Sequence, residues 1–302
     1  MNRPLRIGTR GSPLALAQAG MVAAALRAAH NWEEDRVQIV PITTTGDVIQ
    51  DRPLTEVGGK YLWTKELDRC LMDGRTDISV HSMKDVETIR PPELVIAAML
   101  PRADVCDRLI GADSIDALPQ GARVGTSSPR RTAQLLNRRP DLEIVSIRGN
   151  VQTRLAKLEA GEVDATLLAA AGLERLGIDV GTVISGMLPA PAQGAVGMEA
   201  RSDAHEVLAL VRAIDHHETH LCVSAERRLL EGLGGTCRSP VAALARLEDG
   251  RIFLRAEIHT GDGSECAQGS AKFHPQDRDG PADLARQLLD RSSAVLRALF
   301  SG

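Results

Sequence analysis

The sequence predicts an α/β protein that ends in a smaller α+β unit, and three observations lead to this prediction. Short β-rich runs alternate with helical patterns through the first two hundred residues, which is typical of α/β layers with largely parallel sheets. Beyond about Glu218 the order changes to a helix, two strand-like runs and a closing helix. The chain has 302 residues, of which 43% are hydrophobic and 25% charged, so it can form two or three domains with large cores.

The expected elements follow this alternation. Apolar and β-branched runs mark strands at residues 5–8, 37–42, 78–80, 94–99, 123–125, 144–147 and 165–168. Helical spacing marks helices at residues 13–29, 64–73, 129–137, 151–160 and 170–176. In the last part we expect helices at 218–230 and near 281–300, with strands at 251–259 and 264–273. Turn residues interrupt the pattern at 101–104, 189–197 and 216–218, where we expect domain boundaries.

Composition excludes several classes of protein. No run of about 18 uncharged apolar residues occurs, so no membrane span is predicted. The net charge of −4 and the few aromatic residues (three Phe, two Trp and one Tyr) disfavour nucleic-acid binding. Five cysteines without a CxxC pair do not form a disulfide framework, which favours a reducing cytoplasm. The apolar run at residues 13–17 is shorter than the ~7–15 residues of a signal-peptide core.

Two loops share one sequence pattern. GTRGSP at residues 8–13 and GTSSP at residues 125–129 each follow a predicted strand and open a predicted helix. Serine suits the N-cap and proline the first helical position, so the free N–H groups of such a start can bind an anion. Simple capping is the alternative for either loop. Two copies with arginine beside both favour anion binding.

Other basic residues lie on predicted loops and helix starts, and they are Lys60, Lys84, Arg130, Arg131, Arg148 and Arg154. Gathered at the carboxyl ends of strands, they would form a pocket for a molecule with several carboxylates, because the guanidinium fork pairs with carboxylate. A solvated surface position is the alternative for each of them. Asp85, in VHSMKDV at residues 80–86, would follow a short strand near these cations and stay ionised. Its alternative is a surface pair with Lys84.

One cysteine differs in its setting from the rest. Cys237 lies in the glycine-rich run GGTCRSP at residues 234–240, where Arg238 could lower the pKa of the thiol and prepare it for covalent attachment. An inert core cysteine is the common alternative. His216 and His220 are four residues apart, with Cys222 beyond, but they do not form H-E-x-x-H, and no metal site is predicted.

Taken together, these motifs resemble the porphobilinogen deaminase (hydroxymethylbilane synthase) family. The motifs that carry this resemblance are VHSMKDV at 80–86, GTSSPRR at 125–131, RGNVQTRL at 148–155, PAPAQGAVG at 189–197, HHET at 216–219, AER at 225–227 and the Cys237 loop. The resemblance runs from residue 8 to the Cys237 loop, and the segment after it fits the family's third domain.

The resemblance implies an enzyme of tetrapyrrole and heme biosynthesis that condenses four porphobilinogen molecules into the linear tetrapyrrole hydroxymethylbilane and releases ammonia. It implies a dipyrromethane cofactor attached covalently to Cys237, and Asp85 as the catalytic carboxylate that stabilises the cationic azafulvene left by ammonia. The implied cofactor contacts are Lys84, Asp85, Thr126, Ser127, Ser128, Arg130, Arg131, Arg148 and Gly149. The implied substrate contacts are Arg10, Ser12, Lys60, Arg148, Arg154, Arg175 and Gln193.

The resemblance also implies three domains, the first two similar to periplasmic binding proteins, with the site in the cleft between them. We expect residues 1–99 with 198–216 as the first α/β domain, 100–197 as the second, and 217–302 as an α+β domain that carries Cys237. A cytoplasmic monomer is expected, with porphobilinogen as its small-molecule partner and with no nucleic-acid, membrane or metal partner.

Two alternatives remain open from the residues alone. One is a two-domain receptor or sensor for a small polycarboxylate without catalysis, which has no need of Asp85 together with Cys237. The other is a thiol or metal enzyme built on His216, His220 and Cys222, which has only spacing to support it. The sequence departs from the usual family pattern at Tyr61, Trp63, Glu87, Pro129, Ala192 and Thr236.

Overall fold

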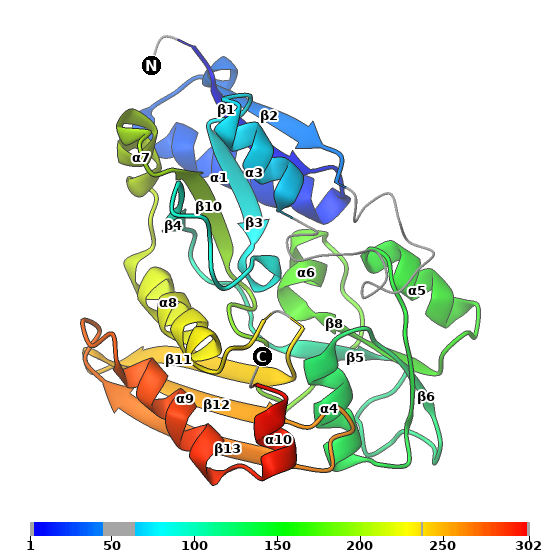
Figure 1. Cartoon of the computed structure of the whole chain (residues 1–302). Helices are drawn as coiled ribbons and strands as arrows, with labels where there is room; N and C mark the ends of the chain where they lie inside the picture. The colour runs from blue at the N-terminus through cyan, green and yellow to red at the C-terminus, as the bar shows by residue number, and fades with distance from the viewer. Residues whose placement is uncertain (1–2, 45–63, 237, 301–302) are drawn as a thin grey trace. The chain divides into compact units, whose positions relative to one another are not determined.

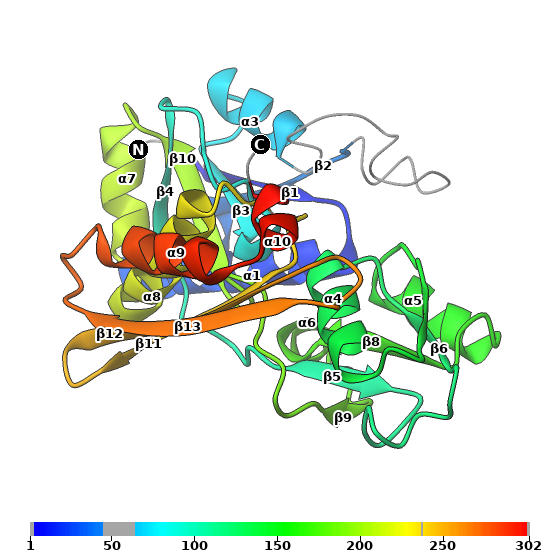
Figure 2. The same cartoon turned by 60° about the horizontal axis from the view of Figure 1, so that its bottom comes forward.

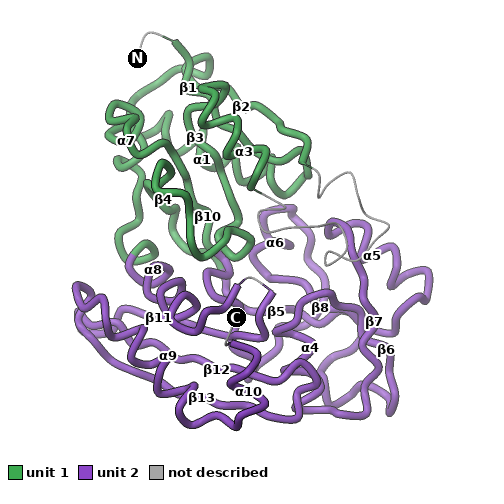
Figure 3. The backbone as a smooth tube through the Cα atoms, viewed as in Figure 1, with its two compact units in different colours: residues 1–103, 195–220 green, residues 104–194, 221–302 purple. Residues whose placement is uncertain are grey.

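The computed structural model describes residues 3–44, 64–236 and 238–300 (Figure 1). The chain forms two compact units, Met1–Ala103 with Ala195–His220, and Asp104–Gly194 with Leu221–Gly302 (Figure 3). The three-domain division stays a prediction. Within the described ranges, no helix is both long and apolar enough to cross a membrane.

The first unit is built on a five-stranded sheet of order β2-β1-β3-β10-β4. β1 pairs in parallel with β2 and β3, whereas β10 pairs antiparallel with β3 and β4. The core forms where the strands pack against α1, with Leu26 of the helix and Ile7 of β1 fully buried. The elements are β1 (Leu5–Arg10), α1 (Pro13–His30), β2 (Val37–Ile42), α3 (Lys65–Met72), β3 (Ile78–Ser82), β4 (Leu94–Met99), β10 (Val196–Arg201) and α7 (His205–Arg212), with 3₁₀ turns at Glu34–Arg36 and Met83–Asp85.

The second unit contains a five-stranded sheet of order β7-β6-β8-β5-β9. β6 pairs in parallel with β7 and β8, whereas β5 pairs antiparallel with β8 and β9. Leu109, Val124 and Leu167 from three of the strands pack against Leu135 of α4. The elements are β5 (Asp107–Ile110), β6 (Arg123–Gly125), α4 (Pro129–Arg138), β7 (Glu143–Val145), α5 (Val151–Glu159), β8 (Ala165–Ala169), α6 (Ala170–Arg175) and β9 (Thr182–Val183).

These two sheets have the same strand arrangement, in which three parallel strands are followed by two antiparallel pairings. The α/β prediction is confirmed, but the expectation of largely parallel sheets is wrong, because half of the strand pairings in each sheet are antiparallel. The antiparallel strands β10 and β5 are absent from the predicted elements. Each begins directly after the chain passes from one unit to the other, and each contains charged residues that break an apolar run.

Both Ser-Pro loops cap a helix, as the sequence predicts. The Ser12 Oγ accepts the N–H of Ala15 at 3.3 Å at the start of α1. The Ser128 Oγ accepts the N–H of Arg131 at 3.4 Å at the start of α4. Since β1 and β6 are equivalent strands in the two sheets, the sequence repeat reflects a repeat of strand, cap and helix.

The rest of the second unit is α+β, as predicted, with a three-stranded antiparallel sheet of order β11-β12-β13. Helix α9 lies over one face of this sheet (Figure 2), where its Leu288 joins Leu254 of β12 and Leu229 of α8 in one core. The expected closing helix is two helices, because the Ser293 Oγ accepts the N–H of Leu296 at 3.1 Å and starts a new helix. The elements are α8 (His217–Gly232), β11 (Val241–Glu248), β12 (Arg251–His259), β13 (Cys266–Phe273), α9 (Gly280–Arg291) and α10 (Ala294–Ala298).

The loop between β12 and β13 packs against the backbone of α4 and so connects the small sheet to that helix. The Asn137 Nδ2 donates a hydrogen bond to the Gly263 carbonyl at 2.8 Å. Gly263 has φ of 71°, and a Cβ atom there would lie 2.5 Å from the carbonyl oxygen of Ala133. Only glycine combines this backbone conformation with so close an approach.

We predict that Gly263→Ala lowers the free energy of unfolding by about 1–3 kcal/mol, because alanine adds left-handed strain and a clash with α4. Urea denaturation followed by circular dichroism measures this change. Gly261→Ala is the matched control, because no atom lies within 4 Å of a Cβ at that position in the same loop. Equal stability of the two variants would contradict the packing of this loop on α4.

Candidate active site

The Lys84–Asp85 turn lies at the end of β3 in the first unit. The Met83 side chain is buried, and its N–H donates to the Ala195 carbonyl at 3.1 Å. The Val86 N–H closes the turn on the Met83 carbonyl at 3.3 Å. Lys84 and Asp85 are therefore presented, half-buried, where the strand ends.

Arg10 and Ser12 lie at the same edge of the first sheet as this turn. β1 and β3 are parallel neighbours, so their carboxyl ends share one edge. The Gln18 Nε2 of α1 donates to the Ser82 Oγ at 2.8 Å and connects the capped helix to the end of β3. Four of the predicted residues are thus brought to one sheet edge of the first unit.

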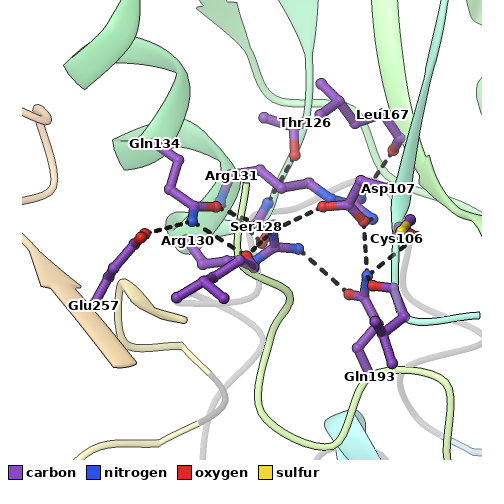
Figure 4. Close-up of polar contacts among 12 residues, drawn as sticks. Cys106, Asp107, Thr126, Ser128, Arg130, Arg131, Gln134, Leu167, Gln193 and Glu257 are labelled. Carbon is purple, nitrogen blue, oxygen red and sulfur yellow. Dashed lines mark hydrogen bonds and ion pairs between the residues drawn. The ribbon is translucent and has the colours of Figure 1, made fainter. Parts of the chain in front are cut away.

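Asp107 organises a buried polar cluster in the second unit (Figure 4). The Arg130 Nη1 donates to its Oδ2 at 2.7 Å, and the Arg131 Nη2 donates to its Oδ1 at 2.6 Å. The Gln193 Nε2 donates to the same Oδ1 at 2.9 Å. All four residues are buried. Because β5 is antiparallel to β8, Asp107 at its start pairs with Ala169 at the end of β8, on the edge where the parallel strands finish.

The charges of this cluster depend on one another. Burial alone would raise the pKa of the Asp107 carboxyl, but the guanidiniums of Arg130 and Arg131 hold it well below its usual range. Burial lowers the pKa of Arg130, and the carboxylate of Asp107 opposes this effect. Glu257 adds a second negative charge, and its Oε2 accepts a hydrogen bond from the Gln134 Nε2 at 3.0 Å. Asp107 therefore holds both arginine side chains in place.

Three of the arginines predicted for the site keep a donor for a further acceptor. Among the residues that the structure describes, the buried Nε atoms of Arg130, Arg131 and Arg175 have no hydrogen-bond partner. The Arg175 Nη2 donates to the Gly194 carbonyl at 2.6 Å, and burial lowers the pKa of this side chain. Buried donors in proteins are normally paired, so a carboxylate ligand would supply the missing acceptors. This donor set fits a group with several carboxylates.

The loops after β6 and β7 are joined by serine hydrogen bonds. The Ser127 Oγ donates to the Ile147 carbonyl at 2.6 Å, and Thr126 contacts β7 through its N–H, which donates to the Val145 carbonyl at 2.9 Å. Beyond them the Arg154 Nε donates to the Gly149 carbonyl at 3.1 Å. The second unit thus gathers a further group of predicted residues at one sheet edge, namely Thr126, Ser127, Ser128, Arg130, Arg131, Arg148, Gly149, Arg154 and Arg175.

Two predicted residues, Lys60 and Cys237, lie outside the described residues. On either side of Cys237, the Thr236 N–H donates to the Ser239 Oγ at 3.0 Å and the Arg238 N–H to the Thr236 Oγ1 at 3.2 Å. The histidines considered for a metal hold the start of α8, where His216 Nδ1 lies 2.8 Å from the Thr219 Oγ1 and His220 Nδ1 lies 2.9 Å from the Asp215 Oδ1.

Asp107 is absent from the residues predicted from the sequence. An aspartate at the start of a strand is ordinarily a surface residue, so the residue type alone does not indicate that Asp107 is buried. The adjacent pair Arg130-Arg131 could have indicated that a counter-charge is needed if these side chains are buried, but not which acid supplies it.

Two family descriptions match the chain. Residues 5–209 match the porphobilinogen deaminase domain that binds the dipyrromethane cofactor, and residues 220–290 match the C-terminal domain of porphobilinogen deaminase.

Relatives of similar length include three named porphobilinogen deaminase. That of Sphingopyxis alaskensis is 55% identical and covers 99% of this chain and 98% of its own. That of Paracoccus denitrificans is 50% identical and covers 96% of this chain and 95% of its own. That of Nitrobacter winogradskyi is 46% identical and covers 98% of this chain and 96% of its own. Among solved structures, the VFT2 domain of Bordetella pertussis BvgS is 12% identical with a TM-score of 0.43, covering 74% of this chain and 91% of its own.

We predict that Asp107→Asn lowers the free energy of unfolding by about 3–5 kcal/mol, because it leaves two guanidiniums buried without their carboxylate. The pKa of Asp107 is lower in the folded chain than its ordinary value of 3.8, so the unfolded chain binds this proton first. The stability that Asp107 contributes is therefore present above about pH 4 and lost as the pH falls below it. The variant loses this acid dependence. Urea denaturation between pH 3 and 7 measures both effects.

Asp164→Asn serves as the control, because Asp164 pairs with Arg123 at the surface, where both side chains are 41% exposed. Its unfolding curve at pH 7 should match that of the wild type. An Asp107→Asn variant as stable as this control would show that the arginines do not need the buried carboxylate.

Proposed function

The chain belongs to the porphobilinogen deaminase family, and we propose that Asp85 is its catalytic residue and Cys237 the attachment point of its cofactor. It is a transferase of tetrapyrrole biosynthesis that condenses four porphobilinogen molecules into hydroxymethylbilane with release of ammonia. Its cofactor is dipyrromethane, which supplies the two-ring primer to which substrate is added.

One observation supports the site residues most directly, which is the set of arginine donors without an acceptor. Every substrate ring carries two carboxylates, so a chain of rings needs many cationic donors. The Nε atoms of Arg130, Arg131 and Arg175 fit this need. We propose that they bind carboxylates of cofactor and substrate together with Arg10, Ser12, Lys60, Lys84, Thr126, Ser127, Ser128, Arg148, Gly149, Arg154 and Gln193.

Asp85 has the position and the chemistry for the carboxylate role. It is half-buried at the end of β3, next to Lys84 and within a turn that backbone hydrogen bonds close. As ammonia leaves, positive charge develops on the pyrrole ring, and an ionised carboxylate beside it lowers the energy of that state. Its oxygens can also accept the proton that the attacking pyrrole carbon loses when the new carbon–carbon bond has formed.

We extend the proposal to the organisation of the molecule. We propose three domains, namely residues 1–99 with 198–216, residues 100–197, and residues 217–302, of which the third carries Cys237. We also propose a cytoplasmic monomer without nucleic-acid or membrane partners. The net charge of −4 supports the first of these exclusions.

We predict that the intact mass of the active protein exceeds the sequence mass by one dipyrromethane unit, and that Cys237→Ser removes both this excess and turnover. The reason is that the serine hydroxyl is a much weaker nucleophile than the thiol. Electrospray mass spectrometry of the purified protein measures the excess.

Cys266→Ser is the matched control, because burial, together with Glu257, raises the pKa of Cys266 to about 11 and keeps the thiol protonated. This variant should keep both the adduct and the rate. An adduct that survives Cys237→Ser would show that another residue carries the cofactor.

We predict that Asp85→Asn keeps the fold and the adduct but lowers kcat at least about a hundredfold, because the amide removes the negative charge and the proton acceptor. Formation of hydroxymethylbilane from porphobilinogen measures the rate. Glu93→Gln, at an exposed position of the same unit, controls for loss of a carboxylate. Turnover of Asp85→Asn near the wild-type rate would exclude Asp85 as the catalytic residue.

A further inference from the structure

Arg90 is a buried side chain of the first unit that binds three carboxylates. Its Nη1 donates to the Glu87 Oε2 at 2.9 Å and its Nη2 to the Asp68 Oδ1 at 2.6 Å. Its Nε and Nη2 donate to the two oxygens of Glu199 at 2.8 and 2.9 Å, which is a bidentate pair. The Arg90 side chain is only 7% exposed, and that of Glu199 is fully buried. Such a geometry fixes both partners far better than a surface ion pair.

This network reaches both ends of the segment that carries Lys84 and Asp85. On the amino-terminal side, the His81 Nε2 lies 3.3 Å from the Glu199 Oε2. On the carboxyl-terminal side, Glu87 is held by Arg90 and by the Thr64 Oγ1, which donates to its Oε2 at 2.9 Å. The Arg90–Glu199 pair therefore contacts the residues on both sides of the turn, His81 before it and Glu87 after it.

The charges of the network require Arg90. Burial would raise the pKa of Glu199, but its two hydrogen bonds from Arg90 and the nearby His81 imidazole bring it down to about 2. Burial raises the pKa of Asp68, and the charge of Arg90 opposes that rise. Without the guanidinium, the carboxylates of Asp68 and Glu199 would lose their arginine partner, and Glu87 would lose its ion pair while keeping the Thr64 Oγ1. Repulsion and lost hydrogen bonds would then weaken the hold on Glu87.

We propose that Arg90 is a positioning residue, which acts through Glu87 and Glu199 to hold the Lys84–Asp85 turn in its working geometry. The inference rests on the proposed role of Asp85 and deepens it. It also gives a structural reason for Glu87, one of the positions where the sequence departs from the usual family pattern, because Glu87 is the side chain through which Arg90 reaches the turn.

The test compares the holoenzymes of Arg90→Gln, Arg90→Lys, Glu87→Ala and the double variant Arg90→Gln/Glu87→Ala. We expect kcat to fall about 10–100-fold in Arg90→Gln and in Glu87→Ala, since a small misplacement of a catalytic group costs this much. KM for porphobilinogen should change less than kcat, because Lys84 alone of the proposed carboxylate-binding residues lies in this turn and the others are untouched. Arg90→Lys keeps the charge without the fork, so its kcat should lie between those of Arg90→Gln and the wild type.

The double variant tests the route. If Arg90 acts through Glu87, the kcat of the double variant should be no lower than that of the less active single variant. Rates are divided by the concentration of protein that carries the dipyrromethane adduct, so protein that is unfolded or lacks the cofactor does not affect kcat. Glu87→Ala retains Arg90 with two carboxylates and keeps the test valid if Arg90→Gln fails to fold.

Arg6→Gln is the control for loss of a half-buried arginine that pairs with an aspartate in the same unit. Arg6 binds Asp77, with the Arg6 Nη2 3.1 Å from the Asp77 Oδ1, at the other end of β1. This variant should lower the melting temperature and leave kcat unchanged. Wild-type kcat in both Arg90→Gln and Glu87→Ala, or multiplied losses in the double variant, would overturn this proposal alone. A wild-type protein that consumes no porphobilinogen would overturn the proposed function with it.

Discussion

The buried carboxylate of Asp107 is the constraint on which the arginine-rich part of the second unit depends. Arg130 and Arg131 follow the Ser128 cap on the first turn of α4, and neither is more than 5% exposed. Two buried guanidiniums repel each other and lose their hydration, so a helix start of this kind is stable only around a counter-ion. Asp107 provides one oxygen to each arginine, and Gln193 donates to the oxygen that Arg131 contacts. The start of α4, with its Ser128 cap, therefore depends on β5, because that strand supplies the counter-ion of the two arginines.

In the first unit, too, a buried arginine is paired with a buried acid, and that acid lies on the equivalent strand. In the shared sheet arrangement, β10 of the first unit occupies the position of β5 in the second, next to the third parallel strand. Asp107 opens β5, and Glu199 lies within β10, where it binds Arg90 and His81. In both units the antiparallel strand thus contributes a buried acid that orders basic side chains near the ends of the parallel strands. The two acids hold different residues, since Asp107 binds two arginines of the proposed site whereas Glu199 binds Arg90, which is not one of the proposed ligand contacts.

This shared device explains which elements could be predicted from the sequence. β1, β6 and the capped helices after them show local signals, because the apolar runs and the Ser-Pro pairs are properties of neighbouring residues. β5 and β10 carry Asp107 and Glu199 where a buried strand would ordinarily be apolar, and their partners lie far away in the sequence. Arg130, Arg131 and Lys84 could be singled out by type and motif. The acids that position them could not, because their burial arises only from the tertiary pairing of strands.

The same arrangement reconciles an acidic chain with the binding of a polyanion. The net charge is −4, yet Asp107 contacts the Nη atoms of Arg130 and Arg131 and leaves their Nε donors unpaired. An arginine without such a partner would keep many rotamers, and a ligand would have to restrict them on binding. An arginine held by Asp107 has lost that freedom already on folding. The carboxylate therefore lowers the local positive charge but also lowers the entropic cost of binding, and a ligand with many carboxylates benefits at every arginine so prepared.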